Sequence, residues 1–129
     1  MKAISMALMQ MGMNAYAIGE VSTPGVSKGD VVIAATNKGK TASTCLFMEQ
    51  AKKQGAYVVL ITSMLTEKAS TFADLIIELT VSDLDNENLL TDSYFEYSLM
   101  PLGDCLVEAL AEKKGFNREQ ILHRHANLE

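Results

Sequence analysis

The sequence predicts an α/β domain in which helices cover both faces of an open parallel sheet. Three apolar runs rich in β-branched residues are typical of strands that are buried on both faces. Helices are expected between these runs, at residues 41–54 and 66–73, and this alternation with short connections favours a parallel sheet. A length of 129 residues allows one domain over residues 1–129. The three runs are Val31–Ala35, Tyr57–Thr62 and Leu75–Leu79.

The first 30 residues are expected to contain a helix, a short strand and a loop. Apolar residues recur at helical spacing from Lys2, and Gly12 can adopt the left-handed conformation that ends a helix. A short buried strand is expected at Ala15–Ile18. The following segment, Gly19–Asp30, contains Pro and Gly and is expected to be a loop.

The helix expected at residues 41–54 has one small and apolar face, which should pack on the sheet. Cys45, Met48 and Ala51 share this face, and Gly55 follows the helix as a stop signal.

The last third of the chain is expected to be helical. Residues 80–90 are acidic and lack periodicity, so we expect a crossing loop there. A long helix should follow a cap at Asp92 or Ser93, and Pro101 should kink that helix or displace its start. The sequence Asn117-Arg118-Glu119-Gln120 matches a capping box that opens a short final helix.

Composition and charge argue against several classes of function. The 16 Asp and Glu exceed the 11 Lys and Arg, giving a formal charge of −5, so we expect no nucleic-acid partner. No stretch approaches the roughly 18 apolar residues of a spanning helix, so we expect no membrane partner. The apolar start Ala3–Met13 resembles a secretory signal, but polar residues interrupt it. Cys45 and Cys105 fit neither a disulfide framework nor a zinc spacing, which favours a reducing cytoplasm, and both are expected to be buried.

The polar segment between the first predicted strand and the next helix favours an anion site. Helix-initial N–H groups lack intrahelical partners, and the helix dipole attracts negative charge. The hydroxyls of Thr36 and Thr41 can donate to a phosphate, and Gly39 lets the backbone approach it. Lys38 or Lys40 adds a positive charge. The alternative is an ordinary capped helix start with two solvated lysines.

Gly39-Lys40-Thr41 also matches the end of the nucleotide P-loop, G-x-x-x-x-G-K-[ST]. The first glycine of that motif is replaced by Ala34. The next strand ends in Thr62-Ser63 and not in the Asp that would hold magnesium. Nucleotide hydrolysis is therefore disfavoured.

Several segments together resemble one protein family. They are Lys2-Ala3-Ile4-Ser5-Met6-Ala7-Leu8-Met9-Gln10-Met11-Gly12, Gly19-Glu20, Thr23-Pro24, Gly29-Asp30, the loop from Thr36 to Thr41 and the ending Arg124-His125-Ala126-Asn127-Leu128-Glu129. The chain resembles the sugar isomerase (SIS) domain of phosphosugar isomerases and phosphosugar-binding regulators, and among these it is most similar to 6-phospho-3-hexuloisomerases. The segment Leu102–Leu110 also resembles the L-G-D-A-L-A-V-A-L helix of arabinose 5-phosphate isomerases.

The resemblance implies a flavodoxin-like parallel sheet with its site at the carboxyl ends of the strands. The family's first strand and its G-x-G-x-S loop would precede Met1, and Gln10 stands where the family's R-L-M-H-L-G helix has His. The family's phosphate loop, S-x-S-G-x-T, is matched by Thr36, Lys38, Gly39 and Thr41.

The chemistry implied by the resemblance moves a carbonyl along a sugar phosphate through an enediol, with no metal or other cofactor. This reaction needs a base for a carbon-bound proton and an acid or base for the oxygens. Glu96 falls at the family's F-E helix position, and burial beside Phe95 and Tyr97 would make it a stronger base. His125 falls in the family's terminal motif and can serve the oxygens, including from a neighbouring subunit. The alternatives are a surface Glu in a first helical turn and a His on a frayed terminal helix.

We therefore expect a cytoplasmic isomerase that interconverts a 3-ketohexose 6-phosphate and fructose 6-phosphate. A noncatalytic phosphosugar-binding module is the alternative, and a truncated domain with an open sheet edge is a third hypothesis. Four of the eight Met lie in the first helix, and an apolar, methionine-rich face favours a homo-oligomer, a dimer or a tetramer.

Overall fold

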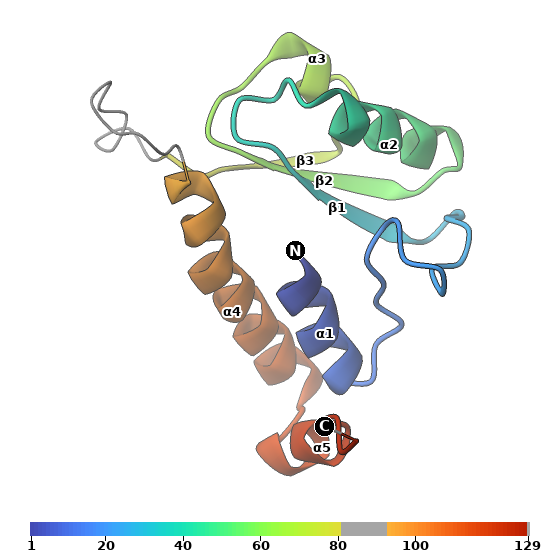
Figure 1. Cartoon of the computed structure of the whole chain (residues 1–129), viewed down its shortest axis with the longest axis vertical. Coiled ribbons are helices and arrows are strands. Elements are labelled where there is room, and N and C mark those ends of the chain that lie inside the picture. The colour runs from blue at the N-terminus through green and yellow to red at the C-terminus, as the bar shows by residue number, and fades with distance from the viewer. Residues whose placement is uncertain (81–92, 129) are drawn as a thin grey trace. The chain divides into compact units, whose positions relative to one another are not determined.

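The computed structural model describes residues 1–80 and 93–128 (Figure 1). The chain divides into two compact units. The sheet unit is Gly25–Glu96, and the helical unit combines Met1–Pro24 with Tyr97–Glu129. The expectation of a single domain over residues 1–129 stays a prediction.

The sheet unit contains three parallel strands in the order β1-β2-β3. Val31 lies opposite Tyr57, and Val59 lies opposite Leu75. The α/β class and the open parallel sheet are therefore confirmed, and β1 forms one edge of the sheet within the described chain. The strands are β1 (Val31–Ala35), β2 (Tyr57–Thr62) and β3 (Leu75–Glu78).

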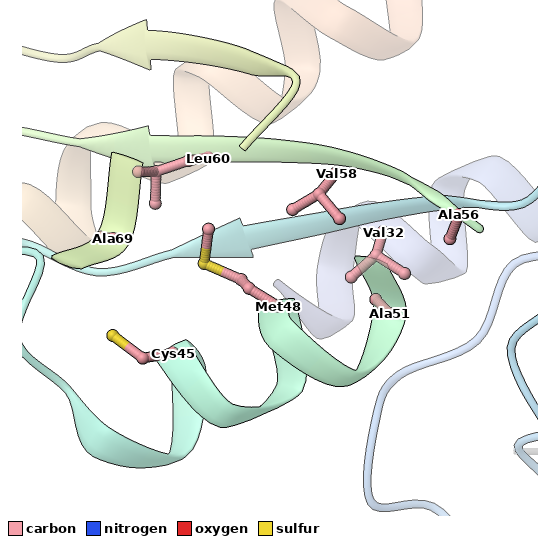
Figure 2. Packing of buried hydrophobic residues seen from close by; sticks show 8 residues of the cluster. All are labelled: Val32, Cys45, Met48, Ala51, Ala56, Val58, Leu60 and Ala69. Atoms are coloured by element: carbon pink, nitrogen blue, oxygen red, sulfur yellow. The ribbon is translucent and has the colours of Figure 1, made fainter. Parts of the chain in front are cut away.

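Helix α2 (Ala42–Lys53) packs against β1 and β2 (Figure 1), whereas α3 (Glu67–Ser70) is a single turn between β2 and β3. Cys45, Met48 and Ala51 of α2 are buried, as expected from their spacing, and Figure 2 shows Met48 and Ala51 directed toward the strands. A fully buried side chain such as Met48 contributes about 1.5–3 kcal/mol by leaving water, so this face fixes α2 on the sheet. The whole cluster is Val32, Cys45, Met48, Ala51, Ala56, Val58, Leu60 and Ala69.

The helical unit is built from α1 (Lys2–Gln10), most of α4 (Tyr94–Lys114) and α5 (Arg118–His123). Gly103 of α4 lies against Ile4 of α1, because a Cβ on Gly103 would be 2.5 Å from the Ile4 Cγ1 atom. The absence of a side chain at this position therefore lets the two helices approach closely.

Two expected cap signals are present in this unit. Gly12 follows α1 with φ +82°, as expected for a glycine that ends a helix. Asn117 and Gln120 form the expected capping box at the start of α5: the Asn117 Oδ1 atom accepts from the Gln120 N–H at 3.0 Å, and the Gln120 Oε1 atom accepts from the Asn117 N–H at 3.1 Å.

The strand expected at Ala15–Ile18 is absent from the described structure, so that prediction is wrong. Tyr16 and Ile18 are about half exposed. An extended segment is stable only when a neighbouring strand satisfies its backbone groups. The described strands pair only with one another.

Pro101 lies inside α4 and does not displace the start of the helix, and the kink expected there stays a prediction. The expectation that Cys105 is buried needs correction. Cys105 is exposed rather than buried, because it lies two residues after the buried Gly103 and so about 200° around the helix. The crossing loop expected after residue 80 and the candidate cap Asp92 lie outside the described residues. No helix in the described ranges is long and apolar enough to cross a membrane.

Candidate functional site

The loop of residues 36–41 joins β1 to α2 at the carboxyl end of β1, and it runs beside the carboxyl end of β2. The Thr36 N–H donates to the Ile61 carbonyl at 3.0 Å, and the Ser63 N–H donates to the Asn37 carbonyl at 3.1 Å. These bonds extend the parallel ladder past the last residue of β1. The loop therefore lies where open α/β sheets place ligands.

Thr36 and Thr41 close the loop through their hydroxyls, whose oxygens are 3.0 Å apart. Thr36 is buried, whereas Thr41 is exposed and occupies the N-cap of α2. Thr41 makes no side-chain cap bond to α2. Its hydroxyl thus pairs with Thr36 and does not satisfy the first amides of the helix, the groups that attract an anion.

Gly39 is buried at the middle of the loop and has a left-handed φ of +63°. A Cβ at this position would collide with the Thr66 hydroxyl and lie 3.3 Å from the Met64 carbonyl oxygen. The Gly39 carbonyl accepts a hydrogen bond from Thr66 Oγ1 at 3.0 Å and a weak one from the buried Cys45 thiol at 3.8 Å. Only glycine fits both this conformation and this space.

Hydroxyls from β2 and the following turn bind a second carbonyl of the loop. The Asn37 carbonyl accepts from Thr62 Oγ1 at 2.9 Å and from Ser63 Oγ at 3.0 Å. Thr62, Ser63 and Thr66 were not predicted to belong to the site. Their position at or just after the end of the second predicted strand was the available signal, because the carboxyl ends of parallel strands meet at one edge of the sheet.

Lys38 and Lys40 both have exposed side chains on this loop. The structure thus brings together the four residues predicted to bind phosphate and adds a second lysine. Two positive charges beside the amino end of α2 favour a negatively charged ligand.

Glu96, the predicted base, lies in the first turn of α4 and is exposed, so the expectation of burial is wrong. Phe95 is buried with 2% of its surface exposed, whereas Tyr97 is 69% exposed. Consecutive helical residues are about 100° apart, so burying Phe95 turns its neighbours away from the core.

His125 lies in the helical unit after α5 and is exposed. Its ring Nδ1 atom is 3.1 Å from the Ala126 carbonyl oxygen. This contact is local, so His125 remains accessible at the surface of its unit.

The helical unit has an open groove of about 440 Å³, which is lined by residues from the first and the last parts of the chain. Gln10 and Gly12 line it from one side, and His123 and Arg124 line it from the other. A Cβ on Gly12 would be 3.3 Å from the Arg124 guanidinium carbon, so the glycine makes room for that side chain. Gln10 and Arg124, the first residue of the terminal motif, therefore line one groove. In the described ranges, no group of three or more His, Cys, Asp or Glu could hold a metal ion.

Comparisons of the sequence and of the fold with known proteins both find sugar isomerase (SIS) proteins. The family model of the SIS domain matches residues 2–100. The 3-hexulose-6-phosphate isomerase of Bacillus subtilis (strain 168) is 35% identical over 134 residues, which cover 99% of this chain and 72% of that protein.

Solved structures with the same fold include a hypothetical protein from Methanococcus jannaschii, for which a molecular function of 3-hexulose-6-phosphate isomerase is inferred. It is 26% identical, with a TM-score of 0.90 over 99% of this chain and 71% of that one. A ligand-bound protein of E. coli CFT073 is 23% identical, with a TM-score of 0.78 over 96% of this chain and 69% of that one, a likeness of fold.

Proposed function

Because the chain belongs to the SIS domain family, we propose that it is a phosphosugar isomerase that interconverts a 3-ketohexose 6-phosphate and fructose 6-phosphate. The observation that carries the proposal is the loop of residues 36–41. It combines two hydroxyls, a buried left-handed glycine and two lysines at the amino end of α2. The name of the Bacillus subtilis relative supports this choice of reaction.

In the proposed complex the loop binds the substrate phosphate. Thr36, Lys38, Gly39 and Thr41 supply hydroxyl, ammonium and backbone donors to its oxygens. Charge-assisted bonds of this kind hold one end of an open-chain sugar and leave its carbonyl end free to react. The proposed ligand is a phosphorylated sugar, and the proposed reaction uses no cofactor.

In the proposed reaction Glu96 removes the C2 proton of the 3-ketohexose 6-phosphate. The C2–H electron pair forms the C2=C3 bond while the C3=O π pair moves to O3, which takes up a proton to give the enediol. The O2 proton then leaves as the C2=O bond forms, and the C2=C3 pair takes the same carbon proton, or one from water, at C3. His125, from this chain or from a neighbouring subunit, transfers the proton between O2 and O3. Glu96 is exposed in the single chain, which favours a homo-oligomer in which a second copy covers it. We place the proposed reaction in the cytoplasm.

The test is proton NMR of fructose 6-phosphate incubated with the protein in heavy water. Formation of the 2,3-enediol should exchange the C3 proton for deuterium, and no guess about the product is needed. Exchange at C1 in place of C3 would instead assign aldose–ketose chemistry. Folded protein that gives neither exchange nor the signals of a new sugar phosphate would reject the isomerase.

Two pairs of variants assign the roles. Glu96→Gln should abolish exchange, whereas Glu108→Gln, on the same helix and also exposed, should not change it. His125→Gln should slow exchange by about 100-fold or more, the usual contribution of a general acid or base, and His123→Gln should leave it nearly unchanged. Equal turnover in Glu96→Gln would reject Glu96 as the base.

A noncatalytic phosphosugar-binding module is the second candidate. Gln10, where the family's helix has His, favours it. Gln cannot act as a general acid or base near neutral pH. The same NMR samples separate the two candidates, because a binding module would broaden or shift the fructose 6-phosphate signals without exchanging any carbon-bound proton.

A further inference from the structure

Thr66 stands at the N-cap of α3 but does not cap that helix. Thr at an N-cap ordinarily accepts a hydrogen bond from an amide of the first turn. Here the structure shows no such side-chain bond, and the Thr66 hydroxyl donates to the Gly39 carbonyl at 3.0 Å. The hydroxyl therefore acts on the loop that joins β1 to α2.

The bond from Thr66 sets the direction of an amide. A trans peptide group is planar, so its C=O and its N–H point in opposite directions. The Gly39 carbonyl points toward Thr66 and toward the Cys45 thiol, which is only 3% exposed. The N–H of the same peptide group belongs to Lys40, so it is directed outward, away from the core.

The carbonyl of the peptide group two positions earlier is also held by hydroxyl groups. The Asn37 carbonyl is directed toward the end of β2, where it accepts from the Thr62 and Ser63 hydroxyls. The Lys38 N–H of that peptide group is therefore also directed away from β2. Backbone N–H groups of a turn that are directed away from the protein can form an anion-binding concavity.

We propose that Thr66 is a positioning residue of the phosphate site, which holds the Lys40 N–H in the direction of the substrate phosphate. The inference rests on the proposed function and extends it to Thr66, a residue outside the loop. In this proposal Thr66 itself does not touch the substrate. Gly39 provides the left-handed conformation, and Thr66 selects one orientation of the Gly39–Lys40 peptide group. Without the hydroxyl, only the weak thiol bond from Cys45 holds the carbonyl.

The test compares Thr66→Val, which keeps the shape and removes the hydroxyl, with Thr66→Ser, which keeps the hydroxyl. Thr71→Val is the matched control, because the Thr71 hydroxyl also donates to a backbone carbonyl, that of Glu67 at 2.7 Å, at the other end of α3. Dissociation constants for fructose 6-phosphate and for inorganic phosphate are measured by calorimetry, KM and kcat by the isomerase assay, and thermal unfolding by circular dichroism.

Thr66→Val should weaken binding of both probes and raise KM by about ten- to hundredfold, the range for one hydrogen bond to a charged group, with kcat nearly unchanged. Thr66→Ser should remain within about threefold of the natural protein, and Thr71→Val should bind as the natural protein does. A merely structural role would lower the unfolding temperature of Thr66→Val and leave the affinity of its folded fraction unchanged.

The outcomes separate this inference from the function on which it rests. If the natural protein binds both probes and folded Thr66→Val binds them equally well, Thr66 is not a positioning residue. If Thr66→Ser loses as much affinity as Thr66→Val, the hydroxyl is not the cause, and the proposal is also overturned. If the natural protein binds neither probe, the proposed phosphate site is wrong and the role of Thr66 fails with it.

Discussion

Gly39→Ala should destabilise the protein through two separate costs. A left-handed φ, here +63°, costs an L-residue about 1–2 kcal/mol. The new Cβ would also collide with the Thr66 hydroxyl and lie 3.3 Å from the Met64 carbonyl oxygen, and overpacking of this kind costs about 1–3 kcal/mol. We expect the free energy of unfolding to fall by about 2–5 kcal/mol.

Gly29→Ala is the matched control in the same unit. Gly29 has φ +98°, and a Cβ there would meet nothing within 4 Å, so this variant carries only the backbone cost. Because +98° lies further than +63° from the left-handed minimum near +57°, the control overstates that cost. Urea unfolding followed by circular dichroism should still show Gly39→Ala to be less stable by about 1 kcal/mol or more.

A double variant tests the cause. Thr66→Ala removes the atom that the new Cβ meets, so the loss from Gly39→Ala should be smaller in the Thr66→Ala background than in the natural protein. Equal losses for Gly39→Ala and Gly29→Ala, or no coupling in the double variant, would refute the argument that the turn around Thr66 packs tightly on the loop.

Three further variants test the surrounding fold. Gly103→Ala places a Cβ against Ile4, so thermal unfolding should show a loss of about 1–3 kcal/mol, and no loss would mean that the two helices separate easily. Asn117→Ala removes the α5 capping box and should cost about 0.5–2 kcal/mol, with Asn117→Asp retaining most of the stability. The side-chain hydrogen bond from Lys52 is the main cause that lowers the pKa of Asp74, so this contact stabilises the fold above the usual carboxyl pKa and is lost as pH falls through the lowered value. The difference in unfolding temperature between the natural protein and Asp74→Asn should therefore shrink between pH 6 and pH 3, and a constant difference would contradict the role of this ion pair.

The strands and α2 could be predicted closely because their signals are local. β1 and β2 have the bounds that their uninterrupted β-branched runs predict, and β3 ends at Glu78, one residue before the expected end. The α2 face of Cys45, Met48 and Ala51 is buried, because a spacing of three residues repeats on one side of a helix.

The failures have a different physical origin, because they depend on partners or on helical phase. The run Ala15–Ile18 is apolar enough for a strand, but sequence cannot supply the neighbouring strand that it needs. Glu96 and Cys105 were expected to be buried, but both are exposed on α4. The buried positions are taken by Phe95, which is next to Glu96, and by Gly103, which is two residues before Cys105.

The candidate site was predicted in part. The residues of the loop at 36–41 could be assigned from the strand, loop and helix order alone. The hydroxyls that orient the loop come from residues 62–66, at or after the end of the next strand and beyond the intervening helix α2, so no local pattern connects them to the loop.

The two uncapped helix starts limit how this protein can be engineered. Thr41 and Thr66 are residues that stability-guided design would replace by Asp or Asn to improve α2 and α3. At either position a carboxylate or amide that capped its own helix would release Thr36 or Gly39 from its present hydrogen bond. At Thr41 a carboxylate would also place a negative charge where the phosphate is expected. Gains in thermostability at these two sites are therefore expected to reduce substrate affinity, and a stabilised variant should be sought elsewhere in the chain.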